Sequence, residues 1–324
     1  MAFLAAPDKF RGSLTASQAA RALALGAGGE CRELPLADGG EGTLEVLGGP
    51  NRSTRVTGPL GDPVDAEWRL DGGIAVIETA RASGLALAGG ADGNDPLNAT
   101  TRGAGELIAA ALAEGAQEVV VAVGGSATTD GGLGALEALG GERFRVPVRV
   151  ACDVQTLFVD AADVFAPQKG ATPAQVVVLS RRLATLAERY GAAVSSLPGS
   201  GAAGGLAGGL ASLGAELVPG FELVAAHVGL DAALDGATLV LTGEGRLDTT
   251  SFEGKVVGGV LDACARQGIP VVVIAGEVEP GLVAPVPAYS LVERFGRDRA
   301  YAEPEACVAE LAAEATGRVT RSAP

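Results

Sequence analysis

The stretch that decides the fold is VAVGGSATTDGG, at residues 121–132. It continues a run of β-branched residues from Glu118, which predicts a buried strand over residues 118–123. Glycines and hydroxyl residues follow this strand, and the sequence after Gly132 indicates a helix. A glycine-rich loop that opens a helix offers backbone N–H groups and the positive end of the helix dipole to phosphate oxygens. The stretch therefore predicts an α/β unit whose loop binds an anion.

Strand and helix patterns alternate along the rest of the chain. Strands are predicted over residues 3–6, 31–36, 64–70, 74–78, 118–123, 148–152, 238–242 and 270–275. Helices are predicted over residues 13–25, 104–114, 173–190 and 303–315, the first with Thr15 and Gln18 at the spacing of a capping box. This alternation is typical of a largely parallel sheet with helices on both faces.

Length, composition and net charge restrict the class of protein to which the chain can belong. A chain of 324 residues is long enough for about two domains, and 48% hydrophobic with 19% charged residues is the composition of a folded globular protein. The formal net charge of −15 argues against a nucleic-acid or anionic-membrane partner, because both require a basic surface. An anionic substrate would have to be held by local cations and backbone amides.

Nothing in the sequence predicts an exported or membrane protein. The opening MAFLAA lacks the basic lead of a signal peptide, and no apolar run approaches the length of a membrane span. The four cysteines are scattered and form no CxxC pair, which favours thiols that serve as small hydrophobic side chains. We therefore expect a reduced, cytoplasmic protein.

The scarcity of histidine and lysine reduces the number of catalytic mechanisms that the chain could use. His227 is the only histidine, which excludes Ser-His-Asp and Cys-His nucleophile schemes and histidine-built zinc sites. Acid–base work must fall to Asp, Glu or Lys. The three lysines, Lys9, Lys169 and Lys255, all lie in glycine-bearing segments, where a compact ammonium group could be required. Chance placement on the surface is the alternative for each.

Acidic residues among glycines follow the predicted strands at five places. They are residues 8–13 (DKFRGS), 38–43 (DGGEGT), 124–132 (GGSATTDGG), Asp153 and 242–248 (TGEGRLD). Each alone is more often a turn than a site. Because ligands of open α/β sheets bind outside the carboxyl ends of the strands, the five together predict one functional site.

Phosphoryl transfer would use all of these residue types. Carboxylates suit Mg²⁺, which binds oxygen ligands and works with nucleotide phosphates. A further carboxylate could accept the proton of an attacking hydroxyl, and lysine or arginine could neutralise the transferred group. The combination favours ATP-dependent phosphorylation of a small hydroxylated molecule.

Two other nucleotide motifs carry less weight. GSGAAG, at residues 199–204, fits the GxGxxG dinucleotide pattern but does not follow a convincing strand, so NAD binding is the weaker hypothesis. Gly254-Lys255 is followed by Val256, so the chain has no GxxxxGK[ST] motif and is not a P-loop kinase.

The ordered segments together resemble the glycerate kinase type I family along nearly the whole chain. The segments are APDKFRGS at 6–13, LPLADGGEGT at 34–43, GGSATTDGGLGALEALG at 124–140, ACDV at 151–154, VFAPQKGAT at 164–172, GSGAAGGL at 199–206 and LTGEGRLDTTSFEGKVVGGV at 241–260. Lys9 and Arg11 stand where the family usually has Ser and Lys, so Arg11 is the better candidate for a cation. The segment between Leu139 and Val148 is shorter than in the family.

The resemblance implies ATP-dependent, Mg²⁺-supported phosphorylation of D-glycerate, usually at the 2-hydroxyl. It also implies a two-domain α/β fold with the active site in the cleft. We expect a discontinuous Rossmann-like domain from residues 1–75 and 240–324, and an inserted α/β domain at residues 76–239.

The candidate site residues follow from the matched motifs. The catalytic candidates are Asp38, Glu41, Asp130, Lys169 and Asp248, with Asp38 first as general base. The substrate-binding candidates are Arg11, Ser13, Arg246 and Lys255, and the nucleotide or phosphate candidates are Gly124, Gly125, Ser126, Thr128, Gly201 and Gly204. The metal candidates are Asp153 and Glu244.

Alternatives stay open at this point. The kinase could act on the 3-hydroxyl or on a related small hydroxy acid. A non-catalytic nucleotide or sugar-acid sensor and an NAD-dependent oxidoreductase are hypotheses of other classes. The partners expected are small molecules, with the chain as a monomer or homodimer.

Overall fold

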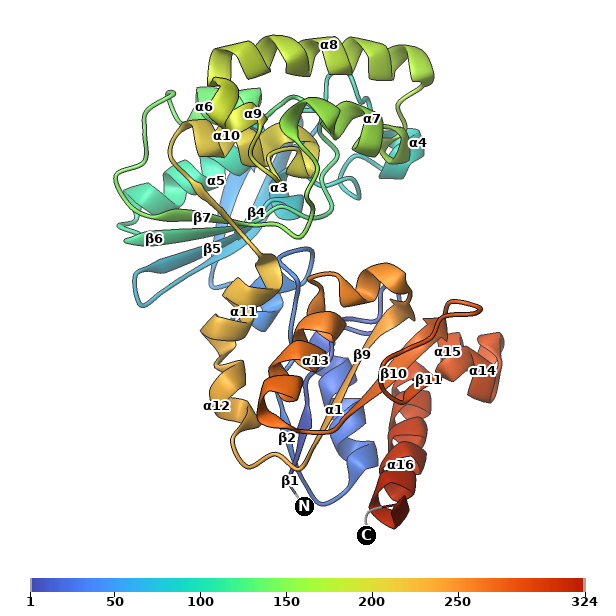
Figure 1. Ribbon diagram of the computed structural model, residues 1–324. Helices are drawn as coiled ribbons and strands as arrows, with labels where there is room; N and C mark the ends of the chain where they lie inside the picture. The colour runs from blue at the N-terminus through green and yellow to red at the C-terminus, as the bar shows by residue number, and fades with distance from the viewer. Residues whose placement is uncertain (1, 323–324) are drawn as a thin grey trace. The chain divides into compact units, whose positions relative to one another are not determined.

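The structure, a computed structural model, describes residues 2–322 (Figure 1). The chain forms two compact units. Unit 1 contains Met1–Asp38 and Phe221–Pro324, and unit 2 contains Gly39–Gly220. Each unit has its own sheet and its own hydrophobic core.

Unit 1 is built on a parallel sheet. Among the described residues the sheet has five strands in the order β11-β10-β9-β1-β2, all paired in parallel. The strands are β1 (Ala2–Ala5), β2 (Glu30–Glu33), β9 (Leu239–Leu247), β10 (Val271–Val278) and β11 (Ala288–Ser290). The helices are α1 (Ala16–Ala27), α11 (Gly220–Val228), α12 (Leu230–Leu234), α13 (Val256–Gln267), α14 (Leu291–Phe295), α15 (Arg297–Ala302) and α16 (Pro304–Ser322), with the 3₁₀ turn η4 (Thr249–Phe252).

Both faces of this sheet are covered, because successive strand side chains point to opposite faces. Phe3 and Ala5 belong to the core formed with α1 and α16, which lie side by side (Figure 1). Leu4 and Ala6 belong to the core formed with α11, α12 and α13. The short apolar strand β1 is therefore buried on both sides.

Unit 2 contains a mixed sheet. In the described part of the chain its six strands have the order β3-β4-β5-β6-β7-β8, with β3, β4 and β5 antiparallel and β5 to β8 parallel. They are β3 (Arg52–Thr57), β4 (Pro63–Asp71), β5 (Ile74–Glu78), β6 (Glu118–Ala122), β7 (Val148–Ala151) and β8 (Glu216–Val218).

The helices of unit 2 are mostly short. They are α2 (Thr43–Val46), α3 (Ala80–Ser83), α4 (Gly90–Gly93), α5 (Arg102–Ala113), α6 (Leu133–Ala138), α7 (Ala161–Phe165), α8 (Pro173–Tyr190), α9 (Ala192–Ser195) and α10 (Leu206–Ser212), with the 3₁₀ turns η1 (Phe158–Asp160), η2 (Pro167–Lys169) and η3 (Ala202–Gly205). The main core surrounds Trp68 and Leu107. A second cluster around Phe158 and Leu183 lies where α8 packs against α7 (Figure 1).

The α/β class and the parallel-dominated sheets confirm the prediction from the strand and helix pattern. The capping box at Thr15 is also present: Gln18 N donates to Thr15 Oγ1 at 3.2 Å, and Thr15 N donates to Gln18 Oε1 at 2.9 Å. Among the described residues, no helix combines the length and the apolar character needed to cross a membrane.

The boundaries between the units differ from those predicted near residues 75 and 240. The chain passes from unit 1 to unit 2 after Asp38 and returns after Gly220. The reason is pairing and packing: β3 and β4 pair into the sheet that continues through β5 to β6, while α11 and α12 bury their apolar side chains in unit 1.

Candidate active site

The loop Gly39–Gly42, here called the glycine loop, crosses the carboxyl ends of three neighbouring strands of unit 2. A β-carbon on Gly39 would lie 2.8 Å from the Cβ of Ala151, the last residue of β7. One on Gly124, just beyond β6, would lie 2.7 Å from the Cα of Gly40. Gly42 N donates to Glu78 Oε1, at the end of β5, at 2.9 Å. The first two approaches leave no room for a side chain at Gly39 or Gly124.

The backbone conformation of the loop also requires glycine. Gly39 and Gly42 have φ of 85° and 94°, in the left-handed region where side chains are strained. Thr43 Oγ1 donates to the carbonyl oxygen of Gly40 at 2.7 Å and closes the loop on itself. Glu41 lies exposed between these fixed points. The density of glycine in DGGEGT therefore has a structural cause, and the loop presents an acid at strand ends where α/β proteins bind ligands.

The 124–132 loop is internally hydrogen-bonded. Ser126 Oγ and Thr128 Oγ1 are 2.8 Å apart, and both side chains are buried. Lys169 Nζ donates to the carbonyl oxygen of Thr128 at 2.6 Å and is only 5% exposed. Burial lowers the pKa of Lys169 to about 8, although the nearby Asp130 charge opposes the shift. The structure thus places Lys169 as a support for the loop.

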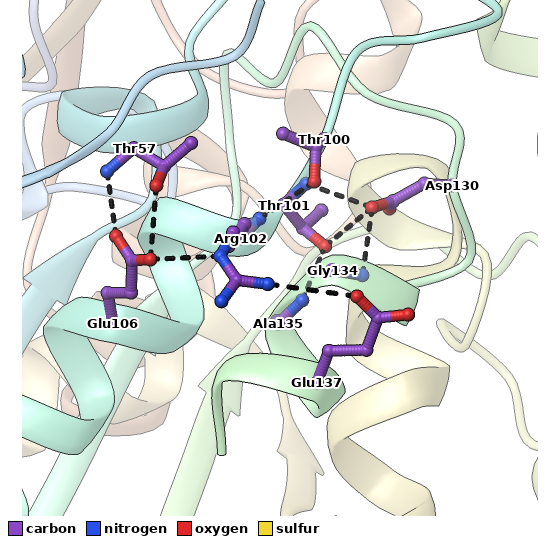
Figure 2. A network of polar contacts seen from close by, with 9 residues as sticks. All are labelled: Thr57, Thr100, Thr101, Arg102, Glu106, Asp130, Gly134, Ala135 and Glu137. Atoms are coloured by element: carbon purple, nitrogen blue, oxygen red, sulfur yellow. Dashed lines mark hydrogen bonds and ion pairs between the residues drawn. The ribbon is translucent and has the colours of Figure 1, made fainter. Parts of the chain in front are cut away.

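Asp130 is the centre of a buried hydrogen-bond network (Figure 2). Its Oδ2 accepts from Thr101 N at 2.9 Å, Thr101 Oγ1 at 2.8 Å and Gly134 N at 3.2 Å, and its Oδ1 accepts from Gly132 N at 3.0 Å. These bonds join α5 to the start of α6. Both oxygens accept hydrogen bonds from the protein, so Asp130 ties α5 to α6, and its catalytic role stays a prediction.

Gly201 and Gly204 also have structural explanations. A β-carbon on Gly201 would lie 2.5 Å from the carbonyl oxygen of Leu157, and one on Gly204 would overlap the carbonyl oxygen of Thr128. Gly204 O accepts from Gly131 N at 3.0 Å. These two glycines therefore pack against the backbone, including that of the 124–132 loop.

Unit 1 gathers acids of its own after β1 and along β9. Burial raises the pKa of Asp8 to about 6 against the opposing charge of Lys9, and the Asp38 charge adds to the rise. Burial also raises the pKa of Glu244 to about 7, with Asp8 and Asp248 contributing. Glu244 Oε1 is buried with no hydrogen-bond partner among the described residues. Asp8 is absent from the predicted site residues, although its place directly after a strand was the available signal.

The remaining candidates of unit 1 lie in polar surroundings. Asp248 Oδ1 accepts from Thr250 Oγ1 at 2.7 Å and Thr250 N at 2.8 Å, which caps η4 and lowers the pKa of Asp248. Lys255 Nζ donates to the same Thr250 hydroxyl at 2.8 Å. Ser13 Oγ donates to the carbonyl oxygen of Phe10 at 3.1 Å and fixes a turn.

The two arginine candidates are exposed. Arg11 lies on the surface, and Arg246, with 64% of its side chain exposed, is 3.9 Å from Glu279. Such a pair binds weakly and leaves the guanidinium accessible to an anion.

The predicted metal ligands are divided between the units. Asp153 lies in unit 2, where its Oδ1 accepts from Gly220 N at 3.2 Å, and Glu244 lies in unit 1. Within the residues that the structure describes, no group of three or more His, Cys, Asp or Glu side chains is arranged to hold a metal.

Comparison with known proteins identifies the family. The model of the Glycerate kinase family matches residues 3–146 and 142–319. The two matched stretches overlap at residues 142–146, within the segment that the sequence predicts to be shortened. Glycerate kinase of Halalkalibacterium halodurans is 40% identical over 345 residues, covering 91% of this chain and 89% of that protein.

Glycerate 2-kinase of Escherichia coli strain K12 is 40% identical over 327 residues, covering 86% of each chain. A crystal structure of a protein assigned as glycerate kinase 2 from Salmonella typhimurium LT2 has a TM-score of 0.82 and 33% identity. It covers 99% of this chain and 98% of that one. On these matches in sequence and fold, the chain belongs to the glycerate kinase family.

Proposed function

We propose that this protein transfers the terminal phosphoryl group of ATP to the 2-hydroxyl of D-glycerate, giving 2-phospho-D-glycerate and ADP. The observation that carries the proposal is the 40% identity to glycerate 2-kinase over 86% of both chains. The acidic loops at the strand ends of both units supply residue types that this reaction requires.

The reaction needs a base for the attacking hydroxyl. Asp38 is the first candidate: its carboxylate would take the hydroxyl proton as the glycerate oxygen bonds to the γ-phosphorus and the bond to the ADP oxygen breaks. Glu41 is the second candidate, since the glycine loop holds it exposed. Asp8 lies close enough to Asp38 for their charges to interact, and it would help to retain the abstracted proton.

The anionic substrates require local cations, because the chain as a whole carries a net charge of −15. Arg11 and Arg246 are exposed guanidinium groups that would bind the glycerate carboxylate, with Lys255 nearby in sequence for phosphoryl charge. The backbone of Gly124 and Gly125 would bind phosphate, with Lys169 holding the loop beneath Thr128.

The carboxylates of unit 1 fit a magnesium ion. Glu244 offers a buried oxygen without a hydrogen-bond partner among the described residues. Burial raises its pKa because it disfavours the charged carboxylate, and a bound cation would stabilise that charge. Mg²⁺ usually binds one or two protein carboxylates together with substrate phosphates, so a cluster of three is not required. Bound there, Mg²⁺ would neutralise and orient the phosphates of ATP. Asp8 is the second candidate ligand, and Asp153 remains a prediction.

The test is an ADP-release assay with D-glycerate and Mg-ATP, followed by phosphorus NMR of the product. Formation of 2-phosphoglycerate is expected, with L-glycerate as the control acceptor. Formation of the 3-phosphate would contradict the regiochemistry and retain the kinase. Absence of turnover while ATP still binds would favour another hydroxy acid or a non-catalytic sensor.

We further propose that the protein works in the cytoplasm on small molecules, as a monomer or homodimer. Size-exclusion chromatography coupled to light scattering measures the mass in solution and tests whether the protein is a monomer or a homodimer.

A further inference from the structure

We propose that Glu78, which belongs to none of the recognised motifs, is a positioning residue for phosphoryl transfer that holds the glycine loop in place. The inference rests on the proposed function. Glu78 acts in it through the backbone of Gly42, and Glu41 is the loop residue whose direction it fixes.

The position of Glu78 in the sheet supports this role. It is the last residue of β5, and it pairs in register with Ala122, the last residue of β6. Its carboxylate therefore lies at the carboxyl ends of the parallel strands, next to the start of the 124–132 loop. Glu78 is 1% exposed, and its Oε1 accepts the Gly42 N–H at 2.9 Å.

The glycine loop needs such an anchor. Gly42 is the N-cap of the four-residue helix α2 and has no side chain with which to cap it. An unsatisfied N–H at a helix start costs free energy, and a carboxylate at this end is a favourable acceptor. Glycines also leave the loop without side chains that could pack. The bond from Gly42 to Glu78 directly after Glu41, and the Thr43–Gly40 bond that spans Glu41, define the loop's shape.

The surroundings of Glu78 disfavour the charged form of its carboxyl group. Oε2 is buried and has no hydrogen-bond partner among the described residues. Burial raises the pKa of Glu78, while the backbone N–H of Gly42 and the charge of Arg81 oppose the rise. A buried oxygen without a donor favours the neutral acid. Glutamine has the shape of that acid and keeps the acceptor for Gly42.

Three variants of Glu78 distinguish an effect of the position of its carboxyl group on kcat from an effect of its charge. Glu78→Gln keeps the acceptor and the length, Glu78→Asp keeps the charge but withdraws the carboxylate by one methylene, and Glu78→Ala removes both. A displacement of about 1 Å in a catalytic group lowers rates by about a hundredfold. We expect kcat of Glu78→Gln within about threefold of wild type, and kcat of Glu78→Asp and Glu78→Ala lower by roughly a hundredfold, with the KM for ATP little changed.

Glu106→Ala is the matched control. Glu106 likewise accepts a backbone amide, Thr57 N at 2.7 Å, and its other hydrogen bonds among the described residues go to the Thr57 hydroxyl and to Arg102 (Figure 2). We expect this variant to lower Tm and leave kcat unchanged. A loss of kcat in Glu106→Ala equal to that in Glu78→Ala would mean that general destabilisation explains both.

Two results would overturn the proposal. If Glu78→Gln is as slow as Glu78→Ala while Glu78→Asp is active, the charge of Glu78 acts directly. If Glu78→Ala folds and turns over like wild type, Glu78 positions nothing. If Glu78→Ala does not fold, the comparison of kcat between Glu78→Gln and Glu78→Asp still tests the proposal.

Hydrogen exchange separates this proposal from the proposed function. We expect the amides of residues 39–47 to exchange faster in Glu78→Asp than in wild type and Glu78→Gln. Absence of kinase activity in the wild type would contradict the proposed function alone. Equal exchange in all variants would overturn the anchoring by Glu78.

Discussion

Lys169 carries an ammonium group that burial disfavours, which makes the stability of the protein depend on pH. The unfolded chain keeps this proton up to about pH 10.5, and the folded protein loses it near pH 8. Between these values the unfolded state binds more protons, so the free energy of unfolding rises with pH. We expect urea titrations to show this rise in the wild type and its absence in Lys169→Met. Parallel curves for the two proteins would show that Lys169 keeps an ordinary pKa.

Asp38 and Asp130 should respond differently to substitution, although both are acids within glycine-rich loops. Asp38→Asn should lower kcat by a factor on the order of 10² to 10⁴ with little change in Tm, since it removes a proton acceptor. A Tm loss with near-normal kcat would make Asp38 a structural residue.

Asp130→Ala should instead act on stability. It leaves the buried amides of Thr101, Gly132 and Gly134 without their acceptor, and the expected loss is about 3 kcal/mol or more. Chemical denaturation measures this loss, and unchanged stability would favour the predicted catalytic role of Asp130. The sequence could not separate the two acids, because Thr101, the partner of Asp130 at the start of α5, lies 29 residues away along the chain.

At the scale of elements, the glycine loop predicts a graded pair of substitutions. Gly39→Ala meets both a strained φ of 85° and the Cβ of Ala151, while Gly61→Ala meets a φ of 97° with no atom within 4 Å. We expect Gly61→Ala to lose about 1 kcal/mol from backbone strain and Gly39→Ala clearly more. Thermal unfolding measures both. Equal losses would show that the loop yields to the extra carbon.

Strands buried on both faces were the most predictable elements. The predicted strand over 74–78 is β5, and that over 118–123 is β6 with one residue less, because β-branched residues fill both. β3 (RSTRVT) was not predicted, since only Val56 in it is buried and its polar residues belong to a sheet edge. Glu78 was missed as a site residue for a related reason: at the end of an apolar strand, a lone acid is typical of a strand terminus.

At the scale of the whole molecule, the buried acids of unit 1 predict an effect of magnesium. Glu244→Gln removes a charge that burial penalises, so we expect it to raise Tm in the absence of Mg²⁺. Added Mg²⁺ should raise the Tm of the wild type and have less effect on this variant. An equal response of the two proteins would place the ion elsewhere, with Asp153→Asn as the next variant to measure.

The arrangement of the sheets constrains the order in which the chain can fold during synthesis. Unit 2 is one continuous segment, whereas β1 lies between β2 and β9, and β9 begins only at Leu239. Domains fold as units while the ribosome extends the chain, so unit 2 can be complete before β9, one of the two strands that pair with β1, has been made. The segment of β1 and α1 is then made before unit 2 but is fully buried after it. During that interval the apolar side chains of β1 and α1 are exposed, and they are the segment on which chaperones would act.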